Sequence, residues 1–167
     1  MELSKSEINE ANEVADLMFK IDNWDADYIT SLSSEILQYQ PYFLSVLAGV
    51  RVEVTEEELE EILKIYFLIW EFFRENKNVL EKKVTEADFN KVLDKQVDML
   101  RYMEGEPTKK EKGKVVSYDF EKIRSRSLLA AALLRFNDRP VIAKMDEQMK
   151  GHIFIGIKSF IECFENL

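Results

Sequence analysis

Apolar side chains recur at three- and four-residue steps along most of this chain, the spacing of one face of an α-helix. In the first such stretch they are Ile8, Ala11, Val14, Leu17, Met18 and Ile21. Similar stretches begin near residues 29, 59, 89, 120 and 142. With 5 Gly and 3 Pro among 167 residues, the chain is poor in the turn residues that an all-β protein needs. We therefore predict an all-α protein, a bundle of five to seven helices forming one domain over residues 1–167.

Three of the predicted helix starts have the spacing of a capping box, in which Ser or Thr and a carboxylate three residues later satisfy each other's free backbone amides. The pairs are Ser4 with Glu7, Thr55 with Glu58, and Thr85 with Asp88. The pattern leaves two helix breaks open. Pro41 removes an amide donor and disfavours helical geometry at the residue before it. Gly151 interrupts the apolar stripe of the last predicted helix.

The stretch that follows Thr55 has the widest apolar surface in the chain. Its main stripe consists of Leu59, Ile62, Tyr66, Ile69 and Phe73, and Leu63, Phe67, Trp70 and Phe72 extend that stripe around the helix. A helix that is apolar on most faces belongs in the interior of a bundle. We predict a central helix at about residues 56–74, with Ile62, Tyr66, Ile69 and Phe73 inside.

Charge is distributed unevenly along the chain, whose net charge is −9. Residues 1–62 contain fifteen acidic and three basic side chains, a net charge of −12, so the remainder carries +3. The acidic part would repel phosphate, which argues against nucleic acid as a partner. Basic side chains gather over residues 106–126, and they include Lys109, Lys110, Lys112 and Lys114. These four lysines are a candidate interface for an acidic partner or for the acidic third of another copy; the alternative, which we favour, is a solvated loop.

The composition also bears on location. No apolar run approaches the ~20 residues that cross a bilayer, and no apolar leader follows a basic start, so we predict no membrane partner. The single cysteine, Cys163, cannot form an internal disulfide, which favours a reducing compartment. We therefore expect a cytoplasmic protein.

No metal or cofactor is predicted. The only histidine, His152, is eleven residues from Cys163, too far along a helix for the two to share a zinc ion. Asn23-x-Asp25-x-Asp27 imitates the start of a calcium loop but lacks its glycine and its final glutamate, so helix capping is the favoured interpretation.

Five residues are candidates for a small internal pocket. Gln96 lies near the apolar face of its predicted helix, and Arg124 follows Ile123 at the edge of another. Tyr66, Trp70 and Tyr102 would supply aromatic walls. The alternative, which we favour, is that Gln96 and Arg124 form an interhelical hydrogen bond and a salt bridge, because buried polar groups need partners.

The C-terminal stretch, residues 153–164, is apolar on more than one face. Phe154 and Ile155 fall outside its main stripe, where a monomer would expose them to water. Exposed apolar clusters mark interfaces, and a two-fold dimer is the commonest way to cover them. We expect a homodimer through these two residues; the alternative is that another helix of the same chain, such as the first, covers them.

The sequence contains no glycine-rich phosphate loop, no G-x-S-x-G turn and no Cys–His nucleophile pair. We therefore predict no catalytic residues and lean against an enzyme. The leading hypothesis is a non-catalytic binding or regulatory protein that acts through contacts with a protein partner or with itself. The second hypothesis is a small-molecule-binding bundle, sensor or enzyme, with an internal pocket near Trp70.

Overall fold

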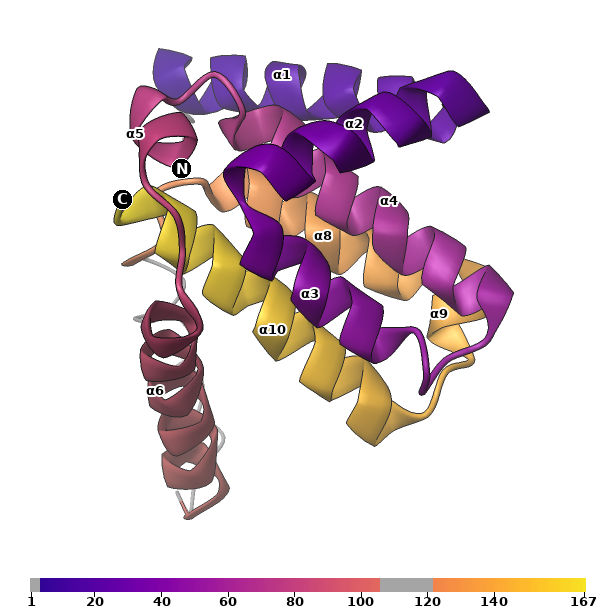
Figure 1. Ribbon diagram of the computed structural model, residues 1–167. Coiled ribbons are helices and arrows are strands. Elements are labelled where there is room, and N and C mark those ends of the chain that lie inside the picture. Colours follow the sequence, from indigo (N-terminus) through magenta and orange to yellow (C-terminus); the bar gives the residue numbers. More distant parts are fainter. Residues whose placement is uncertain (1–3, 106–121) are drawn as a thin grey trace.

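A computed structural model describes residues 4–105 and 122–167, and the structural statements below concern those residues. This part of the chain is all-helical and contains no strand. Its nine helices outnumber the five to seven predicted, because α5 and α9 are too short to show an apolar stripe (Figure 1). The helices are α1 Lys5–Asp22, α2 Ala26–Tyr39, α3 Pro41–Val50, α4 Glu56–Phe73, α5 Lys77–Glu81, α6 Glu86–Gly105, α8 Arg126–Asp138, α9 Pro140–Ala143 and α10 Glu147–Glu165.

The three predicted capping boxes are present. Ser4 and Glu7 cap α1, Thr55 and Glu58 cap α4, and Thr85 and Asp88 exchange the same pair of bonds before α6. At the start of α2, the Asp25 carboxylate accepts a hydrogen bond of 2.8 Å from the Tyr28 amide, which fits the capping role predicted for this acidic stretch. These local bonds account for where four of the helices begin.

The two open helix breaks have different outcomes. Helix α2 ends before Gln40, and α3 begins directly after it with Pro41 in its first turn. Gln40 is fully buried, and its side-chain amide donates to the carbonyls of Val79 and Lys82, both at 2.6 Å. Its side-chain oxygen accepts from the Val84 amide at 2.9 Å. Gly151, by contrast, lies inside an unbroken α10.

Helix α4 contacts α1, α3, α8, α9 and α10. Its residues Ile62, Tyr66, Ile69 and Phe73 are each at most 5 % exposed. Figure 1 shows α3 and α8 alongside α4, and α1 and α2 together over its C-terminal half. This arrangement buries the apolar stripe of α4 against the neighbouring helices.

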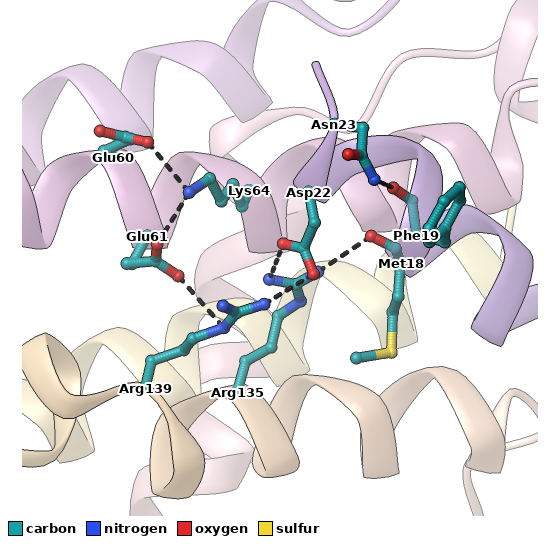
Figure 2. Close-up of polar contacts among 9 residues, drawn as sticks. All are labelled: Met18, Phe19, Asp22, Asn23, Glu60, Glu61, Lys64, Arg135 and Arg139. Atoms are coloured by element: carbon teal, nitrogen blue, oxygen red, sulfur yellow. Dashed lines mark hydrogen bonds and ion pairs between the residues drawn. The ribbon is translucent and has the colours of Figure 1, made fainter.

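An ion-pair network holds the end of α1 against α4 and α8 (Figure 2). Asp22 accepts from Arg135 at 3.0 Å and from Arg139 at 2.7 Å, and it holds the two arginines with different oxygens. Arg139 also lies 3.5 Å from Glu61, which in turn pairs with Lys64 at 2.8 Å. Because Arg135 is only 1 % exposed, its buried guanidinium needs a partner of opposite charge, and Asp22 supplies it.

Replacement of the buried Ile69 by alanine is expected to lower the free energy of unfolding by about 2–5 kcal/mol, through lost transfer energy and a cavity. Urea denaturation measures this change. Leu37→Ala on α2, at a side chain 61 % exposed, is the control and should change stability by less than about 0.5 kcal/mol. Equal losses for both variants would contradict the burial of Ile69.

The Gln40→Leu variant keeps most of the side-chain volume but leaves two carbonyls and one amide without their partner. We expect a loss of about 1–3 kcal/mol in the free energy of unfolding, because these groups are then buried unsatisfied. Gln38→Leu, two residues earlier at an exposed position, is the matched control. A neutral Gln40→Leu would show that these bonds contribute nothing net.

Candidate functional site: a groove between α1, α2 and α4

A half-open groove of about 820 Å³ lies where α1, α2 and the end of α4 meet. Two smaller pockets, of about 470 and 280 Å³, lie elsewhere on the described part of the chain. The residues that line the groove are Glu13, Leu17, Lys20, Glu35, Gln38, Tyr39, Glu71, Phe72, Arg74, Glu75 and Leu80. Four of these are carboxylates and two are cations, so the lining carries a net charge of −2.

One of the lining groups is a buried carboxylate. The side chain of Glu71, in the last turn of α4, is only 5 % exposed. It accepts hydrogen bonds from the Tyr28 hydroxyl at 2.7 Å, from Lys20 at 3.0 Å and from Arg74 at 3.0 Å. The donors come from α1, from α2 and from the residue that follows α4. Glu71 therefore joins these three segments at one point.

The bonds to Glu71 determine its charge state. Burial disfavours ionisation of the carboxyl, but the bonds from Tyr28 and Lys20 and the charge of Arg74 outweigh it, so the pKa of Glu71 lies below its ordinary value. Burial and the neighbouring carboxylate raise the pKa of Tyr28, which keeps its phenol protonated as a donor at neutral pH. The groove thus contains a stable negative charge.

Arg74 pairs with a second carboxylate across the groove. Its Nε donates to Glu35 Oε1 at 3.0 Å, and its Nη2 donates to Glu35 Oε2 at 2.5 Å. This two-point pairing is the arrangement that a planar guanidinium forms with a carboxylate. Arg74 thereby links α2 to the end of α4.

The remainder of the lining is apolar. Leu17, Tyr39, Phe72 and Leu80 are half-buried and pack against the core. The Tyr39 ring stacks on Trp70, with ring centroids 6.4 Å apart. A groove with an apolar wall and carboxylates suits a side chain that has an aliphatic stem and a cationic head.

The five residues predicted for an internal pocket have different surroundings. Tyr66 and Trp70 are 2 % and 0 % exposed in α4, and neither lines the groove or either of the two smaller pockets. Gln96 donates to Glu162 of α10 at 2.7 Å and accepts from Lys158, so it forms the predicted interhelical hydrogen bond. The Tyr102 side chain lies outside the described residues.

Arg124 is exposed at the start of the segment that leads into α8. Its backbone amide donates to Glu165 of α10 at 3.2 Å. It lines the pocket of about 280 Å³ together with Glu7 and Glu10 of α1. Arg124 therefore lines a pocket whose lining does not include Trp70.

Of the residues predicted for an interface, two are described by the structure and four are not. Lys109, Lys110, Lys112 and Lys114 lie outside the described residues. Phe154 and Ile155 are half-buried, and the Phe154 ring packs edge-on against Phe136 of α8 at 5.5 Å. The chain's own α8 therefore covers part of the surface that was expected to face water. Dimerisation through these two residues remains a prediction.

The pocket of about 470 Å³ lies between α6 and α10 and is lined by Cys163, Asp88, Lys91 and other residues of these helices and of the segments beside them. Burial, followed by the charges of Glu162 and Asp88, raises the pKa of the Cys163 thiol to about 12. The thiol is therefore protonated at neutral pH, which disfavours its use as a nucleophile.

Among the described residues, no cluster of three or more His, Cys, Asp and Glu side chains is placed to hold a metal ion. In the same part of the chain, no helix combines the length and the apolar character that crossing a bilayer requires.

The prediction from sequence did not include Glu71 or its donors. One signal was present: Glu71 is the only charged residue within residues 65–73, which are otherwise apolar. A lone carboxylate in such a run is buried with its neighbours and needs donors. No spacing rule identifies Lys20 and Tyr28 as those donors, since they are 51 and 43 residues away.

Acid is expected to remove the contribution of Glu71 to stability. Because its pKa is lowered in the folded state, this contribution is complete above the ordinary value of 4.5 and is lost as the pH falls below it. Glu71→Gln should therefore lower the free energy of unfolding by about 1–3 kcal/mol at neutral pH and by much less near about pH 3. Urea denaturation at both pH values measures the difference.

The control for this experiment is Glu75→Gln, at an exposed carboxylate one turn further along. It should change stability by less than about 0.5 kcal/mol at either pH. A Glu71→Gln effect that stays constant down to acid pH would contradict the assignment.

Comparison with protein families, with curated proteins and with solved structures finds no match to this chain. The geometry and charge of the groove are therefore the basis for its function.

Proposed function

We propose that this chain is a non-catalytic binding protein, and that its groove between α1, α2 and α4 holds a basic segment of a protein partner. The observation that carries the proposal is a groove of about 820 Å³ with a net charge of −2 and a buried carboxylate in its lining. A cationic side chain is the group whose charge complements this lining.

The surrounding charge supports the same partner. Residues 1–62, which supply α1 and α2, carry a net charge of −12. A field of one sign raises the rate at which an oppositely charged partner meets the site. The groove also lies at the C-terminal end of α4, where the helix dipole favours cations.

The apolar wall of the groove sets a second requirement. Tyr39 and Phe72 offer aromatic surface to a lysine or arginine stem, and aromatic faces attract cationic heads. The partner we propose therefore presents basic and apolar side chains together, as on one amphipathic helix. The proposal places the interaction in the cytoplasm, where a free, buried Cys163 remains reduced.

The second hypothesis, a small-molecule pocket near Trp70, has one observation in its favour. Trp70 Nε1 is buried and has no acceptor among the described residues. A buried donor without a partner is a group that a ligand can satisfy. We prefer the groove because it is a half-open space of about 820 Å³ lined by charged and apolar side chains, whereas Trp70 is fully enclosed.

The test uses a fluorescent helical peptide with leucines on one face and arginines on the other. Fluorescence anisotropy measures its Kd for the wild type and for Glu13→Lys/Glu75→Lys, which reverses two exposed carboxylates of the groove. We expect binding by the wild type and about a tenfold weakening in the variant, since two attractive contacts become repulsive.

The control is a double variant with the same change in net charge at positions outside the groove. Glu53→Lys/Asp138→Lys reverses two exposed carboxylates that do not line the groove, and it should leave the Kd within about twofold. Equal weakening in both double variants would show that only net charge matters, and absence of binding by the wild type would end the proposal.

A further inference from the structure

The bonds to Glu71 are unevenly distributed between its two oxygens. Lys20, Tyr28 and Arg74 all donate to Oε1. The second oxygen, Oε2, has no donor among the described residues. A carboxylate that is 95 % buried and lines a groove thus keeps an unused acceptor there. Oε2 is not one of the fully buried polar atoms without a partner, so it is open to water or to a donor that enters the groove.

The three donors differ in how firmly they are held. The Tyr28 hydroxyl is half-buried and lies 2.7 Å from Glu71. The guanidinium of Arg74 is also anchored to both oxygens of Glu35. Lys20 is 48 % exposed, and its other described contact is with the face of the Tyr28 ring at 5.1 Å. Returning a half-exposed ammonium to water costs little, so Lys20 is the donor most easily displaced.

We propose that Lys20 is an exchangeable cover over Glu71, and that an arginine side chain of the protein partner displaces it on binding. The inference rests on the proposed function of the groove and adds to it the residue that a partner must supply. A guanidinium offers two parallel N–H donors, so it can bond Oε1 and Oε2 together, whereas an ammonium acts as a single point charge.

The groove already contains one two-point pairing of a guanidinium with a carboxylate. The Arg74 guanidinium spans both oxygens of Glu35 and reaches Glu71 with its remaining nitrogen. A second guanidinium at Glu71 would give the buried carboxylate the two-point pairing that Glu35 already has. The inference therefore predicts a preference for arginine over lysine in the partner, which charge complementarity alone does not.

The experiment measures the Kd of the leucine–arginine peptide for the wild type and for Lys20→Ala. Removal of the cover should tighten binding about threefold, because the arginine no longer competes with an internal donor. Lys20→Met, which keeps the apolar stem without the charge, should tighten it similarly. Lys5→Ala on the same helix changes the net charge equally at an exposed position and should leave the Kd unchanged.

The peptide itself supplies the second comparison. Versions with lysine or with the uncharged citrulline in place of arginine should bind the wild type progressively more weakly. The advantage of arginine over lysine should disappear in Glu71→Gln, once urea denaturation has confirmed that this variant is folded. If Glu71→Gln does not fold, the comparison of Lys20→Ala with Lys5→Ala decides alone.

The results separate the two proposals. Binding of the peptide in the groove, with a Kd that Lys20→Ala leaves unchanged or weakens, would overturn the exchange of Lys20 and leave the binding function standing. Tightening by Lys20→Ala and Lys5→Ala to the same degree would also overturn it, since only net charge would then matter. Absence of binding by all variants would overturn both proposals.

Discussion

Residues 65–73 of α4 are enclosed on nearly every side by other helices, and a single carboxylate, Glu71, is enclosed with them. A buried charge is tolerated only where donors surround it. Here the donors come from Lys20 on α1, Tyr28 on α2 and Arg74 after α4. The positions of α1 and α2 over the end of α4 therefore satisfy an electrostatic requirement as well as an apolar one.

The charged side chains that enclose Glu71 also line the groove. Glu35, Glu71 and Arg74 form a charged lining, and the apolar residues Leu17 and Phe72 lie beside it. The groove combines the two properties that a basic, partly apolar segment needs, and it does so in the most acidic third of the chain.

The Asp22 network has a different character. One oxygen of Asp22 accepts from Arg135 and the other accepts from Arg139 (Figure 2). Arg139 also pairs with Glu61, so each charged side chain in this network has a partner of opposite sign. Burial disfavours ionisation of Asp22, but the two arginines outweigh it and lower its pKa. We assign this network to holding α1 in place. Glu71 differs because it lines the groove, which no member of the Asp22 network does, and that difference selects the groove as the candidate site.

The sequence by itself determined the elements whose causes are local. Capping boxes and apolar periodicity act within a few residues, so the starts of α1, α4 and α6 followed from spacing, whereas Pro41 only marked a position at which a break was possible. Gly151 did not break α10, because a glycine inside a packed helix costs less than the burial that the helix gains. Only the tertiary structure decided the partners of Gln40 and Glu71, which are about 40 to 50 residues distant. It also placed α8 over Phe154. Such pairings depend on how helices cross, and the crossing is set by the shapes of many side chains at once, which no periodic pattern along the chain encodes.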